Sequence, residues 1–172
     1  MLRIIGIITL LIGCIGLGLS LQNRMKDNLS SLNRIRQIFL MLQNEIIYSK
    51  ASLPEACKRI GERTQEPYKS SFYQIYEIMA QNRGDSFSKV WKDNMSECTA
   101  LLPLAQNDKN IFLSFGDCAG FMDGKMQADA IEQYIHDLDL SVKKLEEEMA
   151  GKSKVIMSLS VMGGLLAVII LI

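Results

Sequence analysis

The amino-acid sequence predicts an all-α protein with a transmembrane helix at each end. Apolar residues in the centre of the chain recur at steps of three and four, the spacing of one face of an α-helix, and no segment alternates as a strand does. Hydrophobic residues make up 48% of the chain and aromatic residues only 7%, so the excess is aliphatic. It is gathered in two runs without charged residues, 4–21 and 155–172. Each run is close to the roughly 20 residues that a helix needs to cross a bilayer.

The two apolar runs divide the chain into three parts. We expect a transmembrane helix over residues 1–23, a helical domain over 24–154 and a second transmembrane helix over 155–172. Basic residues gather on the inner flank of each run, and the positive-inside rule therefore predicts a cytoplasmic domain with both termini outside. These flanking residues are Arg24, Lys26, Arg34, Arg36, Lys143, Lys144, Lys152 and Lys154.

The first apolar run has two alternative interpretations. A lipoprotein signal would end at Cys14, which follows a leucine and two small or branched residues at positions 11–13. A cleaved signal peptide would need a small-residue cleavage site, and residues 18–20 fit that pattern poorly. Because the apolar run continues past Cys14 to Leu21, its length favours an uncleaved anchor.

The first helix of the domain is expected to continue from the first apolar run, because neither proline nor glycine occurs over residues 20–50. Its apolar face consists of Leu29, Leu32, Ile35, Phe39, Leu42 and Ile46. A second helix is predicted to begin at Ser52, with Pro54 in its first turn and Glu55 in a capping box, and to end near Gln65. The third runs from about Tyr68 to Gln81, with an apolar stripe of Phe72, Ile75, Tyr76 and Met79.

Three further helices follow a turn on Gly84. The fourth starts with Ser86 as its cap and contains Trp91, which we expect to anchor the core. Asp108 is predicted to cap the fifth, and Asp123 to cap the long last helix. The predicted apolar residues are Ile111, Phe112 and Phe115 in the fifth helix and Met126, Ala130, Tyr134, Leu138, Val142, Leu145 and Met149 in the last.

Three glycines stand close together where the fifth helix gives way to the last. Gly116, Gly120 and Gly124 are costly inside a helix, so we expect a tight, closely packed helix–turn–helix corner here. The GxxxxGK spacing of a phosphate-binding loop is absent, and no strand precedes the glycines.

The sequence gives no sign of catalysis, a cofactor or a metal site. The only histidine, His136, is expected to lie on a helix surface, and the acidic residues near the glycines lack the spacing of a calcium loop. None of the four cysteines has CxxC spacing, which favours free, buried thiols. A net charge of zero gives no hint of nucleic-acid binding. We therefore predict a protein that is not an enzyme.

The zero net charge conceals two oppositely charged segments. Residues 24–64 contain eight basic and four acidic residues, a net charge of +4, whereas residues 117–150 contain three basic and nine acidic residues, a net charge of −6. Two explanations remain open: the segments attract each other within the domain, or the acidic segment binds a basic partner.

Several short motifs carry a resemblance to a known family. The motifs cover residues 42–48, 53–56, 84–87 and 115–120, and in this order, between two apolar ends, they resemble the stage III sporulation protein AB family of spore-forming Firmicutes. The match covers nearly the whole chain. That family is in turn similar to the cytoplasmic domain of the platform proteins of type II secretion and type IV pilus machines. Their Gly-Glu-x-x-Gly corner corresponds to residues 116–120, with Asp117 in place of the glutamate.

The resemblance implies a bundle of about six helices and a non-enzymatic platform in the channel complex between mother cell and forespore. The protein would lie in the outer forespore membrane, in contact with lipid and other channel proteins, with its domain in the mother-cell cytoplasm. A secretion-type ATPase similar to stage III sporulation protein AA would dock there, and we expect it on Asp129, Glu132, Asp137, Asp139 and Glu146. The residues expected to define the fold are Glu45, Leu53, Ala56, Gly84, Phe87, Gly116, Asp117, Gly120 and Asp123.

Two alternative functions are compatible with the sequence. One is a platform of a type II secretion or type IV pilus system in growing cells. The other is a lipoprotein with an extracellular helical domain, which predicts lipidation of Cys14.

Overall fold

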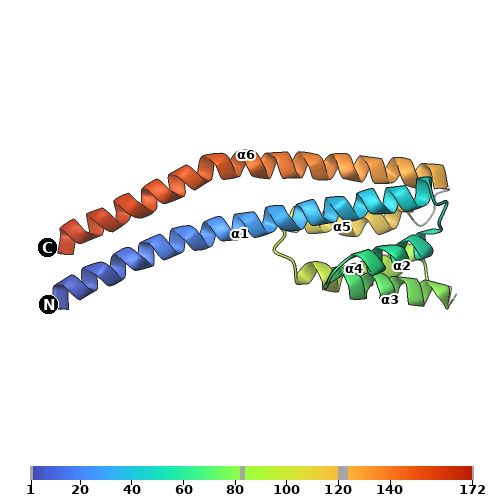
Figure 1. The fold of residues 1–172 in the computed structure, drawn as a ribbon, viewed down its shortest axis with the longest axis horizontal. Helices are drawn as coiled ribbons and strands as arrows, with labels where there is room; N and C mark the ends of the chain where they lie inside the picture. The colour runs from blue at the N-terminus through green and yellow to red at the C-terminus, as the bar shows by residue number, and fades with distance from the viewer. Residues whose placement is uncertain (1, 82–83, 120–123, 172) are drawn as a thin grey trace. The chain divides into compact units, whose positions relative to one another are not determined.

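The computed structural model describes residues 2–81, 84–119 and 124–171, and within these ranges it contains six α-helices and no strands (Figure 1). This confirms the predicted all-α class and the number of helices. The helices are α1 (Leu2–Ile47), α2 (Leu53–Arg63), α3 (Tyr68–Ala80), α4 (Phe87–Ala100), α5 (Gln106–Ala119) and α6 (Gly124–Leu171).

The chain forms two compact units. Ser30–Val142 make up one, which we call the helical bundle, and Met1–Leu29 with Lys143–Ile172 make up the other, which we call the terminal unit. α1 is continuous from Leu2 to Ile47, which confirms that the first apolar run continues into the first helix of the domain. α6 is likewise continuous from Gly124 to Leu171.

Among the residues that the structure describes, no helix is both long enough and apolar enough to cross a membrane. The two transmembrane helices predicted over residues 1–23 and 155–172 are therefore not confirmed.

The inward face of α1 in the bundle is the predicted one. Leu32, Ile35, Phe39, Leu42 and Ile46 are all buried, as expected from their spacing of three and four. The additional buried residue Ile38 widens this apolar stripe, which is characteristic of a helix that packs against several neighbours.

α2 and α3 begin close to the predicted positions, with one difference at the start of α2. Ser52 occupies the N-cap position, but its side chain makes no capping hydrogen bond. Glu55 lies 3.8 Å from Arg59 on the next turn, so the predicted capping box is replaced by an ion pair. In α3 the buried row is Tyr68, Ser71, Phe72 and Ile75, whereas Tyr76 and Met79 of the predicted stripe lie at its half-buried edge.

α4 follows a turn on Gly84, whose φ of +81° favours glycine. Ser86 caps α4 as predicted, since its side chain accepts a hydrogen bond from the backbone N–H of Lys89 at 3.4 Å. Trp91 is completely buried and contacts the rings of Phe72, Phe87, Phe112 and Phe115. It is therefore the core anchor that the sequence predicted.

The structure of α5 and α6 differs from three of the predictions. α5 begins at Gln106, so Asp108 lies buried in its first turn and is not its cap. Gly116 lies inside α5 and not in a corner after it, while Gly120 and Asp123 lie outside the described residues. The buried row of α6 is Ala128, Ile131, Ile135 and Leu138, and Met126 of the predicted stripe is 54% exposed.

The smaller helices pack in chain order, since α2 contacts α3, α3 contacts α4 and α4 contacts α5. α5 joins α1 and α6 through aromatic rings. The ring centroid of Phe39 on α1 lies 5.0 Å from that of Phe115. The Phe39 ring also stacks on the ring of Tyr134 on α6, with 5.8 Å between the two centroids. Stacked and edge-to-face pairs at these distances stabilise a core beyond simple burial.

Candidate partner-binding surface

The outward side of α6 in the bundle is a mixed acidic and apolar surface. Its exposed residues recur at steps of three and four and thus lie along one stripe of the helix. We call this stripe the outer α6 face, and it consists of Met126, Asp129, Glu132, Gln133, His136 and Leu140. The exposure of His136 confirms its predicted place on a helix surface.

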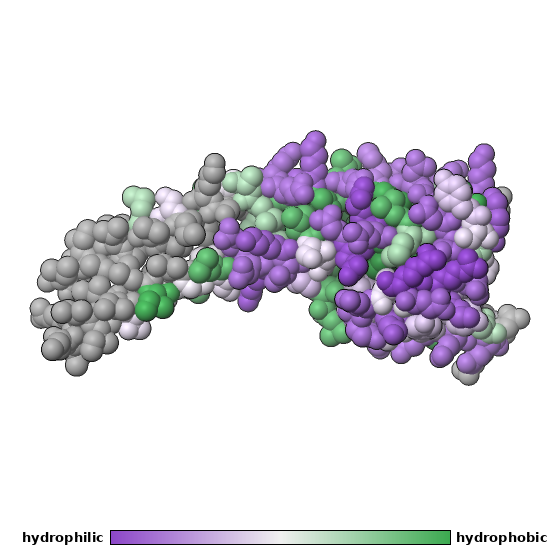
Figure 2. Space-filling model, in the orientation of Figure 1, coloured by the Kyte–Doolittle hydropathy of each residue, from purple (hydrophilic) through white to green (hydrophobic). Residues whose placement is uncertain are grey.

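Apolar side chains lie at both ends of the outer α6 face. Met126 is 54% exposed and Leu140 is 55% exposed, and Asp129 and Glu132 lie between them. Figure 2 shows the wider setting, in which polar residues cover most of the visible surface of the bundle and apolar residues appear among them. Protein-binding surfaces are marked by contiguous apolar patches with a polar rim, whereas Met126 and Leu140 stand singly among polar residues. From the sequence, Met126 was predicted to belong to the apolar stripe and Leu140 was not included, because the spacing of Met126 fits the apolar and the polar stripe equally well.

Two of the predicted docking residues belong to this face and make no ion pair with the residues that the structure describes. They are Asp129 and Glu132. Asp137 is half-buried at the edge and accepts a hydrogen bond from Gln133 at 3.1 Å. Glu146 is exposed, but it belongs to the terminal unit.

Asp139 has a different environment from the other acidic residues of α6. Its carboxylate accepts hydrogen bonds from Nε and Nη2 of Arg36 on α1, the second at 3.4 Å. The hydrogen bond to Asp139 raises the pKa of the Arg36 guanidinium above its ordinary value. The charge of Asp139 is therefore already paired within the bundle. This pair supports the hypothesis that the oppositely charged segments attract each other, at least at one point.

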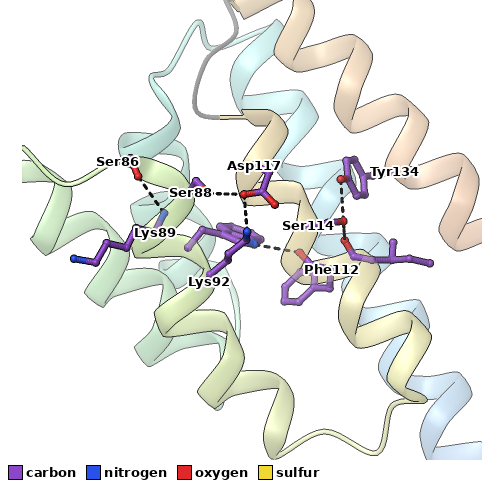
Figure 3. A network of polar contacts seen from close by, with 10 residues as sticks. Ser86, Ser88, Lys89, Lys92, Phe112, Ser114, Asp117 and Tyr134 are labelled. Carbon is purple, nitrogen blue, oxygen red and sulfur yellow. Dashed lines mark hydrogen bonds and ion pairs between the residues drawn. The ribbon is translucent and has the colours of Figure 1, made fainter.

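α6 is held in position by α5. The hydroxyl of Ser114 lies 3.1 Å from the hydroxyl of Tyr134, and Nε2 of Gln127 donates to the backbone oxygen of Ala119 at 3.1 Å. Figure 3 shows the first of these contacts beside the network that joins α4 to α5. The outer α6 face is therefore presented by a helix whose inner side is fixed by side-chain contacts.

Asp117 joins α5 to α4. Asp117 accepts a hydrogen bond from the Ser88 hydroxyl at 2.6 Å and pairs with Nζ of Lys92 at 2.6 Å (Figure 3). The hydrogen bond from Lys92, followed by that from Ser88, lowers the pKa of the Asp117 carboxyl. Asp117 is thus an inter-helix pairing residue at the bundle surface.

Glu45 also links two helices, because its carboxylate on α1 pairs with arginines on α2. The residue is only 5% exposed, and its carboxylate lies 2.7 Å from Nη1 of Arg59 and 3.0 Å from Nη1 of Arg63. The hydrogen bond from Arg59 lowers the pKa of Glu45 although burial acts in the opposite direction. The backbone oxygen of Glu45 also accepts from the N–H of Ala51 at 3.1 Å. Glu45 therefore fixes the connection between α1 and α2 through both its side chain and its backbone.

Three further residues of the set predicted to define the fold serve packing. Leu53, Ala56 and Phe87 are buried at 6%, 0% and 6% exposure. The sequence did not predict the partners of Glu45, because Arg59 and Arg63 are distributed like ordinary surface residues.

The described residues offer no metal site, since they contain no group of three or more histidine, cysteine, aspartate or glutamate side chains that could hold an ion. Cys57 and Cys98 are free and buried, as predicted, while the side chains of Cys14 and Cys118 lie outside the described part. Burial raises the pKa of the Cys57 thiol to about 12 and that of Cys98 to about 11. These thiols are poor nucleophiles at neutral pH.

Comparison with known proteins gives one consistent result. A family model described as stage III sporulation protein AB matches residues 3–172. Stage III sporulation protein AB of Bacillus subtilis strain 168 is 22% identical over 171 residues, which is 99% of each chain. A solved structure of stage III sporulation protein AB superposes with a TM-score of 0.63 at 20% identity, over 72% of this chain and 96% of that one.

Proposed function

The chain belongs to the stage III sporulation protein AB family, and on this premise we propose that it is the membrane platform of the channel complex between mother cell and forespore. Its membership makes it a sporulation protein. In the proposed role it performs no catalysis: it holds a cytoplasmic ATPase at the membrane and transmits the motor's movement to ring-forming and small membrane subunits. The observation that carries this proposal is the continuity of α1 and α6, each of which runs without a break from the bundle into an apolar terminal segment.

The proposal assigns the two apolar runs to the outer forespore membrane. Residues 4–21 and 155–172 carry no charge, and basic residues flank each run on its bundle side. This distribution supports two anchors, a cytoplasmic bundle and both termini outside.

The topology is tested with a cysteine placed on the surface of the bundle. The native thiols Cys57 and Cys98 are unsuitable reporters, because burial protects them on either side of a membrane. Gln74 on α3 is exposed, so Gln74→Cys provides a reactive thiol. In growing cells that express the variant, where the chain would insert into the membrane that faces the medium, we expect an impermeant maleimide to label Gln74→Cys only after that membrane is opened, and the protein to remain in the membrane fraction at high salt. Labelling of intact cells would overturn the proposal and favour the lipoprotein interpretation, which a mass measurement of Cys14 would then examine.

The proposal places the ATPase on the outer α6 face. Asp129 and Glu132 supply negative charge that no described residue neutralises, and Met126 and Leu140 supply apolar area on the same stripe. Such a surface suits a partner segment with basic and apolar side chains, because opposite charges orient the encounter and apolar contacts slow dissociation.

Docking is tested by charge reversal with a matched control. Asp129→Lys/Glu132→Lys reverses two charges on the outer α6 face, and Asp93→Lys/Glu97→Lys reverses two exposed charges on α4. We expect the first variant to lose co-purification of the ATPase from solubilised membranes and the second to retain it. If both variants retained the ATPase equally, the outer α6 face would not be its docking site.

A further inference from the structure

α6 contains a glycine that neither packing nor backbone geometry explains. Gly151 is exposed and lies inside the helix, and a Cβ built on it meets no atom within 4 Å in the part of the chain that the structure describes. Glycine is among the worst helix formers, because its backbone loses the most conformational freedom when the helix forms. The local structure would therefore accept alanine at this position and would gain helix stability from it.

Other glycines in the polar part of the chain have clear reasons. A Cβ on Gly116 would lie 2.7 Å from Cδ1 of Trp91, and one on Gly61 would lie 3.2 Å from Cδ2 of Tyr73. Gly84 has a positive φ. Gly163 also has open space around it, but it belongs to the apolar run, where small residues serve helix contacts in lipid. Gly151 precedes that run and has none of these reasons.

The position of Gly151 gives it a different use. It lies in the polar segment after Val142, the last residue of the bundle, and before Val155, the first residue of the apolar run. No proline interrupts this segment, so Gly151 is its weakest helical position. We propose that Gly151 is a hinge at which α6 opens or bends between the bundle and the C-terminal apolar segment.

The functional importance of this hinge depends on the proposed platform role. A motor bound to the bundle changes the bundle's position during its cycle, while a membrane anchor stays at a fixed depth. A helix that connects the two must either transmit each displacement as a rigid rod or yield at one point. Opening α6 at Gly151 costs little free energy, because hydrogen bonds to water replace the backbone hydrogen bonds that are lost at this exposed position.

The hinge is tested by moving the glycine one position along the helix. Gly151→Ala removes the weak point, and the double variant Ala150→Gly/Gly151→Ala restores one at the neighbouring exposed position with the same composition. Amide hydrogen exchange over residues 146–156 is measured on the full chain in detergent micelles. We expect Gly151→Ala to slow exchange about four- to fivefold and the double variant to return it to the original rate. Unchanged exchange in Gly151→Ala would overturn the hinge.

The role of the hinge is measured as spore yield, with each variant as the sole copy of the gene. We expect Gly151→Ala to lower the yield at least tenfold and the double variant to restore it. Full yield with Gly151→Ala would show that opening is not needed. A loss that the double variant fails to restore would instead identify Gly151 as a close-contact position, and it too would overturn the proposal. Failure of the platform role itself would appear separately, as loss of the wild-type chain from the membrane fraction.

Discussion

Trp91 of α4 lies against the backbone of Gly116 on α5 without room for a methyl group between them. A Cβ on Gly116 would lie 2.7 Å from Cδ1 of Trp91 and 2.9 Å from its Cβ and Cγ. The indole Nε1 donates to the backbone oxygen of Phe112 at 3.1 Å, one turn earlier on α5. The two helices therefore approach as closely as they do because Gly116 has no side chain.

The first prediction is that Gly116→Ala destabilises the protein by about 1–3 kcal/mol, the usual cost of adding a methylene to a filled core. Trp91 is completely buried and contacts several aromatic rings, so it cannot move away freely. Denaturant unfolding of the full chain, followed by helical circular dichroism, measures the change. Gly151→Ala is the control, since its new methyl group meets open space. A loss below about 0.5 kcal/mol would contradict the close packing.

The sequence predicted the close packing at Gly116 but placed this glycine in the corner between two helices and not inside α5. Three glycines in nine residues predicted a tight corner, whereas Gly116 is helical and its reason is the indole of Trp91, 25 positions earlier in the chain. Features that depend on residues close together in the chain were predicted correctly. Ser86 caps α4 as predicted, and the apolar spacing of α1 identified its buried face.

Long-range pairing explains most of what the sequence could not predict. Arg36 and Asp139 are 103 positions apart, and no spacing rule joins them. Asp108 fits a helix cap equally well by composition, but α5 begins three residues earlier than such a cap requires, and Asp108 is buried in its first turn. The outer α6 face became visible only when the buried row of α6 was known, because Met126 continues either stripe.

The second prediction concerns Glu45 and acid. Hydrogen bonding to Arg59 lowers the pKa of Glu45 in the folded state below its ordinary value of 4.5. Its contribution to stability is therefore fully present above about pH 4.5 and is lost as the pH falls through the lower folded value. We expect Glu45→Gln to cost about 2 kcal/mol at pH 7. We also expect it to flatten the loss of stability between pH 5 and about pH 3, measured by urea unfolding at each pH.

The control for this prediction is Glu97→Gln, which removes an exposed carboxylate from α4. It should change the free energy of unfolding by less than about 0.5 kcal/mol at either pH. If Glu45→Gln and Glu97→Gln gave the same acid profile, the two guanidinium groups would not be stabilising Glu45.

The third prediction concerns the thiols of Cys57 and Cys98. Their raised pKa values, about 12 and about 11, leave little thiolate at pH 8, and both side chains are buried. We expect neither to react with iodoacetamide in the folded chain, while Gln74→Cys reacts within minutes. Because the unfolded thiols ionise near 9 and the folded ones do not, stability should also fall as the pH rises above 9. Native labelling at the rate of Gln74→Cys would contradict the buried positions.

The fourth prediction separates pairing from docking on α6. The Arg36–Asp139 pair is 36% and 45% exposed, so Asp139→Asn should cost less than about 1 kcal/mol of stability. Because the carboxylate of Asp139 already accepts hydrogen bonds from Arg36, we expect its loss to leave retention of the ATPase unchanged. Asp129→Asn removes a charge from the outer α6 face and should weaken retention severalfold, with the difference shrinking as salt rises from 50 to 300 mM.

The charge-swapped variant Arg36→Asp/Asp139→Arg sharpens this comparison, because it preserves the pair while reversing the charge at position 139. If docking uses only the outer α6 face, the swapped variant retains the ATPase as well as the unaltered chain does. If the partner also contacts position 139, the arginine repels the partner's basic side chains. Retention would then fall below that of Asp139→Asn, although stability is unchanged. Such a result would extend the docking surface across the edge of α6 toward α1, and it would contradict the assignment of Asp139 to pairing alone.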